Sequence, residues 1–225
     1  TKIVNIEVEE KPTGEISLGA GVGSDGGTVG FAVSENNFLG KGVKLGFDLR
    51  LTEETIRGSF SVNNPNFNYS GKSLVTSLES TKIDRLSTNG YESTKMGFSL
   101  GTGFEQYENT YIRPRLSTYF EDLTTNSDAS ANLKKQSGNY FETRFGYSLD
   151  NDYRNQRFQT SEGHRLIFGQ GIPLISDEYA LSNSLDMQKW FKINEDFITN
   201  LSFYAKNINS LNDYDVRITD RLRFS

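Results

Sequence analysis

Hydrophobic and polar residues alternate along most of this chain. Residues 141–149 read FETRFGYSL, in which Phe141 and Phe145 are separated by Glu142 and Arg144. Successive side chains of a β-strand point to opposite faces of a sheet. The stretch therefore predicts a strand with one apolar face and one polar face, and the apolar face must contact either a protein core or lipid.

The same alternation recurs from residue 13 to about residue 208. It is found before this stretch in ISLGAGV, TVGFAVS, VKLGFDLRL, IRGSFSV, KSLVTSLES, TKMGFSLGTGF and YIRPRLSTYF, and after it in HRLIFGQ, EYALSNSLDMQKWF and DFITNLSFYAKN. Helical spacing of three and four is not sustained in any segment. The pattern predicts an all-β chain of about eleven antiparallel, up-and-down strands. Many of these segments allow about nine or more residues, which is what a tilted strand needs to cross a bilayer.

The connecting segments are rich in turn residues. The longest, LTTNSDASANLKKQSGN around residues 122–138, has almost no apolar content, so we expect a solvated loop rather than a packed one. Successive connections should alternate between the two ends of the strands. The segment NDYRNQRFQTSEG is long for the end that carries the short turns.

Alternation alone fits both a soluble antiparallel sandwich and a transmembrane β-barrel. Long successive strands, glycines on the polar faces and aromatic residues near strand ends favour the barrel, because aromatic girdles mark the membrane interfaces of barrels. The aromatic residues in question are Tyr91, Phe104, Tyr107, Tyr111, Tyr119, Phe120, Tyr140, Tyr179, Trp190 and Phe191. Eleven strands would be an incomplete barrel, because bacterial barrels normally have an even strand number and open edges are costly in lipid.

Composition excludes several other classes of protein. The chain has 225 residues, a net charge of −5 and no cysteine. It has no dense Lys/Arg cluster, so nucleic acid is not an expected partner. Without cysteine, neither a disulfide framework nor a thiolate metal site can form. No run of about 18 apolar residues is present, which excludes a transmembrane helix.

No enzyme, metal or cofactor is expected from the remaining motifs. His164 is the only histidine, and we expect it to be a solvated turn residue rather than a ligand. The glycines of residues 19–23 are not followed by a helix or by the Lys-Ser/Thr of a phosphate-binding loop. Asp150, Asp152 and Glu162 lack the spacing of a calcium-binding loop.

Several stretches resemble the BamA family of outer-membrane protein assembly factors. VEEKPTGEISLGAGVGSDGGTVGFAVSENNFLGKG resembles the junction between the last POTRA domain and the first two barrel strands, with NNFLGKG (36–42) as the first turn. SVNNPNF (61–67) resembles the family's Asn-Pro-Phe/Tyr turn. FGYSLDNDYRNQRFQTSEGHRL (145–166) is similar to a strand, an Asn/Asp turn and Pro-Thr-x-Gly-x-Arg, with Gln159 in place of the proline.

The resemblance implies a domain division. Residues 1–12 would be the C-terminal strand of a preceding POTRA domain and a hinge, which Pro12 ends. Residues 13–225 would be the N-terminal part of an outer-membrane β-barrel, about 11 strands of a 16-stranded antiparallel transmembrane barrel. DVRITDRLRFS (215–225) resembles the approach to the long sixth extracellular loop, whose Arg-Gly-Phe motif would follow Ser225.

The resemblance also implies a function without covalent chemistry. The protein would assemble and insert outer-membrane proteins in the outer membrane of a Gram-negative bacterium, as the barrel of a BAM complex, with unfolded clients, accessory outer-membrane lipoproteins and the lipid bilayer as partners. The first barrel strand would template client strands at a lateral seam. The residues of this client-binding strand are Thr13, Gly14, Glu15, Ile16, Ser17, Leu18, Gly19, Ala20, Gly21, Val22 and Gly23.

Glycines in that strand would weaken its pairing. Alternatively, small residues are there only because the lumen is crowded. The polar faces further predict a lumenal charge network that braces the lumen or holds the sixth loop. Its members are Arg57, Arg113, Arg115, Glu142, Arg144 and Arg165.

Three other functions stay open. A protein-translocating pore of the two-partner secretion or autotransporter-assembly type belongs to the same superfamily. A passive porin would be a barrel without POTRA domains. A soluble sugar-binding sandwich would stay monomeric without detergent.

Overall fold

The computed structural model describes residues 9, 11–23, 26–213 and 215–221. Eleven strands account for most of them, and the predicted all-β chain of eleven strands is confirmed. The strands are β1 Gly14–Gly23, β2 Gly26–Phe38, β3 Val43–Thr52, β4 Thr55–Asn64, β5 Ser73–Arg85, β6 Tyr91–Tyr107, β7 Thr110–Thr125, β8 Gly138–Asp152, β9 Gly163–Ser176, β10 Ala180–Lys192 and β11 Ile198–Ser210. They are 10 to 17 residues long.

Helical structure in the described part of the chain is limited to two short pieces, the 3-10 turn η1 (Phe67–Tyr69) and the helix α1 (Ala131–Lys134). Among the residues described, no helix has the length and apolar character needed to cross a membrane.

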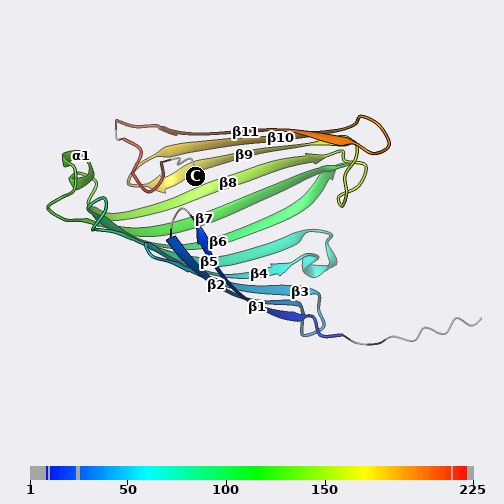
Figure 1. Cartoon of the computed structure of the whole chain (residues 1–225), viewed down its shortest axis with the longest axis horizontal. Coiled ribbons are helices and arrows are strands. Elements are labelled where there is room, and N and C mark those ends of the chain that lie inside the picture. The colour runs from blue at the N-terminus through cyan, green and yellow to red at the C-terminus, as the bar shows by residue number, and fades with distance from the viewer. Residues whose placement is uncertain (1–8, 10, 24–25, 214, 222–225) are drawn as a thin grey trace, which may run out of the picture.

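All eleven strands form one sheet in chain order, and each strand pairs antiparallel with the next. The sheet curls into an open trough with β1 and β11 as its two edges (Figure 1). The connections alternate between two ends. The long connection 153–162 lies at the end where residues 11–13 enter the sheet, and α1 lies at the other (Figure 1).

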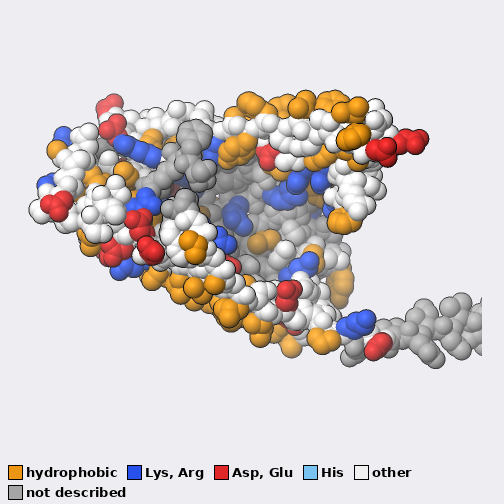
Figure 2. Space-filling view, in the orientation of Figure 1, with side chains coloured by type: hydrophobic (Ala, Val, Ile, Leu, Met, Phe, Trp, Pro, Cys, Tyr) orange, Lys and Arg blue, Asp and Glu red, His pale blue; other side chains and the backbone are white. Residues whose placement is uncertain are grey.

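The outward face of the trough is apolar and the inward face is polar. Thirty-six large hydrophobic side chains are exposed in the described residues, whereas only five hydrophobic residues are buried. Figure 2 shows the exposed hydrophobic side chains along the outside of the trough and charged side chains in its hollow. A soluble sandwich would bury its apolar face, so this distribution fits a sheet whose outside meets lipid.

A small hydrophobic core lies at the α1 end of the trough. It consists of Tyr91, Leu123, Ala129 and Leu133, with Ile83, Tyr140 and Ile218 packed against it. The expectation that residues 122–138 form a solvated, unpacked loop was therefore wrong. The Ser130 side chain caps α1 by accepting a hydrogen bond from the Leu133 amide at 3.3 Å. Leu133 of the capped helix packs in the same core as Leu123 of β7, so the small number of apolar residues in the segment did not prevent their burial.

The expected aromatic girdle was also wrong in part. The Tyr140 ring lies under the guanidinium of Arg217, with 4.6 Å between the ring centroid and the guanidinium carbon. Trp190 similarly faces Arg154 at 5.6 Å, and Tyr91 belongs to the buried core. These rings point into the lumen, because strand parity, not distance from a strand end, decides which face a side chain joins.

Candidate functional site

The first strand is an open edge of the sheet. β1 pairs with β2 from Gly14↔Glu35 to Gly23↔Gly26, and all ten of its residues are exposed. Its other side pairs with no strand in the described part of the chain. Thr13 precedes the strand, and its carbonyl oxygen accepts the Asn36 amide at 3.1 Å. Every second backbone amide and carbonyl of β1 is therefore available to another strand.

The two faces of β1 continue those of the whole sheet. Its apolar residues point outward and its small or polar residues point into the lumen. The outward residues are Ile16, Leu18, Ala20 and Val22, and the inward residues are Glu15, Ser17, Gly19, Gly21 and Gly23. A strand added at this edge would extend both faces.

Glycines of β1 differ from those in the middle of the sheet. A Cβ atom at Gly19, Gly21 or Gly23 would have no described heavy atom within 4 Å. A Cβ at Gly97 would lie 2.6 Å from the Tyr119 ring. Crowding of the concave face therefore explains why position 97 is glycine. It does not explain the three glycines of β1. Each of those three weakens the strand by about 0.5–1 kcal/mol relative to alanine.

One predicted group of charges meets at Asp150 on the inner face of β8. Asp150 is 2% exposed. Arg113 of β7 donates to it at 2.9 Å, and Arg165 of β9 donates to it at 2.8 and 3.0 Å. The carboxylate thus links three neighbouring strands near the end where residues 11–13 enter.

A second group surrounds Arg217, which lies beyond β11. Residues 215–221, here called the docked segment, turn back into the trough (Figure 1). The Arg217 side chain is only 4% exposed. Its guanidinium lies near four carboxylates, at 2.9 Å from Asp220, 3.3 Å from Glu121, 3.3 Å from Glu178 and 3.8 Å from Glu142.

Further ion pairs connect this group to the lumen wall. Lys95 of β6 lies 3.0 Å from Asp220 and 3.7 Å from Glu121. Arg144 lies 2.7 Å from Glu142, its neighbour on the inner face of β8. The Ile218 amide also donates to the Gln136 side chain at 3.0 Å. The docked segment is therefore held by β6, β7, β8 and two connections at the α1 end.

Burial and neighbouring charges shift the pKa values of the ionisable groups in and around the docked segment. Burial would lower the pKa of Arg217, but Asp220 and Glu121 outweigh burial and raise the pKa above its usual value. Burial would raise the pKa of Asp220, yet Lys95 and Arg217 bring that pKa below its usual value. Burial raises the pKa of Glu178 by more than Arg217 offsets. The cluster is thus a guanidinium stabilised by buried carboxylates.

The predicted lumenal network is thus divided. Arg113 and Arg165 share Asp150, and Glu142 pairs with Arg144. Arg57 and Arg115 face the lumen, but neither has an ion pair within the described residues.

Sequence reasoning missed the residues that organise the network. Glu121 and Lys95 fall on the polar faces of their strands, so the alternation could have found them. The missed lumenal residues are Lys95, Glu121, Asp150 as an ion-pair partner, Glu178, Arg217 and Asp220. His164, expected in a turn, is an exposed residue of β9.

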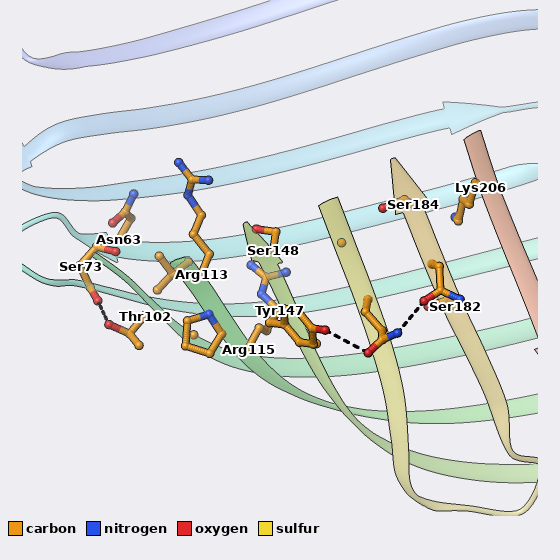
Figure 3. Close-up of a pocket in the computed structure, with 18 residues that line it drawn as sticks. Asn63, Ser73, Thr102, Arg113, Arg115, Tyr147, Ser148, Ser182, Ser184 and Lys206 are labelled. Atoms are coloured by element: carbon orange, nitrogen blue, oxygen red, sulfur yellow. Dashed lines mark hydrogen bonds between the residues drawn. The ribbon is translucent and has the colours of Figure 1, made fainter. Parts of the chain in front are cut away.

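Between the two charge groups the trough holds a polar cavity of about 580 Å³. Figure 3 shows Arg113, Arg115 and Lys206 among hydroxyl side chains on its wall. Thr102 donates to the Ser73 carbonyl at 2.6 Å at one side of this view. Gly101, Gly146, Gly169 and Gly171 also line the cavity. Three basic side chains and no carboxylate are among the described residues that line this cavity.

The Omp85 superfamily domain matches residues 37–222. The chain belongs to the Omp85 superfamily. Members of this superfamily are outer-membrane β-barrels, which agrees with the apolar outside and polar lumen of the trough. The predicted family relationship and the barrel fold are confirmed.

Two solved structures have a similar fold. BamA from Haemophilus ducreyi lacking POTRA domains 1–3 matches with a TM-score of 0.78 and 19% identity, over 94% of this chain and 44% of that one. CdiB from Acinetobacter baumannii matches with a TM-score of 0.54 and 11% identity, over 90% of this chain and 40% of that one. At these identities the likeness concerns the fold. The chain spans less than half the length of either protein.

The prediction that residues 1–12 end a POTRA domain falls largely outside the described residues. Only residues 9, 11 and 12 of that range are described, and none of them lies in a strand. The domain division therefore stays a prediction.

Proposed function

We propose that this chain forms the N-terminal part of a sixteen-stranded BamA-type barrel, which assembles and inserts outer-membrane proteins in a Gram-negative outer membrane. β1 acts as the edge template for client strands. The observation that carries the proposal is an open edge strand in which no described neighbouring atom requires glycine at positions 19, 21 and 23.

Templating at β1 is strand addition. A client strand would pair with the free backbone groups of β1, and hydrogen bonds made by the main chain do not depend on the client's side chains. This suits a partner set of many unfolded outer-membrane proteins. The outward residues Ile16 and Leu18 would match the lipid-facing residues of the client.

Weak strand pairing at β1 would allow the folded client to be released. A template must release its product, so each strand pair that it forms must also be broken. The glycines at Gly19, Gly21 and Gly23 lower strand stability without filling any steric need. No covalent step, metal or cofactor is part of this mechanism, and we infer that the protein is not an enzyme. Accessory lipoproteins and the bilayer itself complete the proposed set of partners.

A protein-translocating pore is the second candidate, because the fold also matches CdiB. The higher TM-score of the BamA match supports the assembly factor. Depletion of the protein separates the two functions. Loss of many outer-membrane proteins supports assembly, whereas loss of one exported substrate supports translocation. A passive porin would leave both sets unchanged.

Cysteine crosslinking in the complete protein tests the template directly. The chain has no native cysteine, so single cysteines at Ser17, Gly19 and Gly21 add the only thiols in this region. Partner cysteines are placed along the C-terminal strand of a client barrel during its folding. Ser59 of β4 provides the matched control, since it also faces the lumen but its strand is paired on both sides.

We expect crosslinks from β1 in one antiparallel register, so that moving the site by two residues moves the best client position by two. Cysteine at Ser59 should give none. If β1 crosslinks only to the protein's own last strand and never to a client, the template proposal fails.

A further inference from the structure

The outward face of β8 to β11 carries a single charged side chain. Strand register and parity place Lys189 on this face, directly opposite His164 of β9 and Leu201 of β11. Within the described residues, Lys189 has no carboxylate within ion-pair distance. An unpaired ammonium on an apolar surface is costly unless an anion or water solvates it.

Lys189 and His164 stand at the rim of an apolar groove. The groove has a volume of about 440 Å³, and the outward residues that line it are Leu166, Met187, Leu201 and Phe203, together with the two polar residues. Arg165, Gln188 and Ser202 also line it, at positions whose strand parity belongs to the inner face. Leu166, Met187 and Phe203 lie further from this end of the strands than His164 and Lys189 do, and Leu201 lies level with Lys189. The groove therefore leads from the rim into the apolar band of the outer face.

Aromatic rings mark the level of the rim. The Tyr153 ring stacks on His164, with 5.4 Å between the ring centroids. The Lys189 ammonium lies 5.7 Å from the centroid of the Phe191 ring. Both contacts lie at the end of the sheet where residues 11–13 enter. Aromatic rings together with cations at a strand end are typical of the headgroup level of a membrane.

We propose that this groove binds one anionic phospholipid, with its phosphate at Lys189 and His164 and one acyl chain along Leu166, Met187 and Phe203. The proposal rests on the lipid-facing role of the outward surface. Charge complementarity favours an anionic lipid, because a zwitterionic headgroup brings its own ammonium to the same rim. Such a lipid would fix the depth of β9 to β11 in the membrane.

Native mass spectrometry of the complete protein in detergent tests this site, with phosphatidylglycerol and phosphatidylethanolamine as the added lipids. We expect phosphatidylglycerol to be retained preferentially. A Lys189→Gln, His164→Gln double variant should retain it at least tenfold less. Lys82→Gln is the matched control, because Lys82 also faces outward but lies at the other end and pairs with Glu92 at 3.1 Å.

A second variant, Met187→Trp, separates a lipid site from a lysine that only reaches the headgroup level. It fills the groove and keeps both polar residues, and we expect it also to lose the lipid. Retention in either variant at the wild-type level, or equal loss in Lys82→Gln, overturns the proposal. Heat-dependent gel mobility checks that each variant is folded. Client crosslinking at β1 is measured on the same samples, so that a failure of this site is distinguished from a failure of the templating function.

Discussion

Replacing Arg217 by alanine should release the docked segment from the lumen. The Arg217 guanidinium is the charge shared by Glu121, Glu178 and Asp220, at distances of 2.9 to 3.3 Å. Asp220 keeps Lys95 in the variant, at 3.0 Å. Glu121, which is 1% exposed, keeps a hydrogen bond from the Ser93 hydroxyl at 2.8 Å, but its nearest remaining cation is Lys95 at 3.7 Å.

The magnitude follows from the loss of that shared charge. Removing one partner of a buried ion pair costs about 3–5 kcal/mol, because the other charge stays buried without compensation. The remaining contact with Lys95 places the cost at the lower limit, about 3 kcal/mol, which is a factor of about 150 in the docking equilibrium.

Hydrogen exchange of the docked segment is the assay. The Ile218 amide donates to Gln136 and can exchange only when the segment leaves the lumen. We expect exchange across residues 215–221 to accelerate by up to about 150-fold in Arg217→Ala. Arg221→Ala is the control, since the exposed Arg221 side chain donates only to the Val216 carbonyl. Unchanged exchange in Arg217→Ala would show that the buried charges do not hold the segment.

Three further predictions concern the same structure. The pKa of Asp220 in the folded protein lies below its usual value of 3.8. The ionised carboxylate therefore stabilises the docked segment fully above about pH 4, and this stabilisation is lost as the pH falls from there through the lowered pKa. Hydrogen exchange of the docked segment, corrected for intrinsic exchange rates, should accordingly accelerate below about pH 4. Leu133→Ala removes a side chain that is 6% exposed and should lower the free energy of unfolding in detergent by about 2–4 kcal/mol, whereas Leu39→Ala, at 73% exposure, should change it by less than about 0.5 kcal/mol. Gly163→Ala places a Cβ 2.2 Å from a backbone oxygen at a φ of +109° and should cost about 2 kcal/mol or more, whereas Gly19→Ala meets no described neighbour and should stabilise the protein by about 0.5–1 kcal/mol; urea unfolding followed by gel mobility compares them.

The alternation of hydrophobic and polar residues predicted the strands well, because this alternation reflects local backbone geometry. Side chains alternate between faces in any extended chain, so the stretch 141–149 revealed both its strand and its two faces. The same reasoning wrongly predicted that Leu123 and Leu133 are solvated. Both have mostly polar neighbours in the sequence, yet both are buried. Their burial depends on a connection folding over the end of the trough.

The all-β class, the number of strands and the apolar outside follow from the sequence alone, because each is a property of residues close together in the chain. Which charges meet depends instead on the three-dimensional arrangement of the strands. Glu121 and Arg217 are separated by most of the second half of the chain, and the curvature of the sheet brings the inner faces of β7 and β8 and the docked segment to one place. Periodicity carries no information about contacts of this kind, because it records which face a side chain joins and not what lies across the lumen.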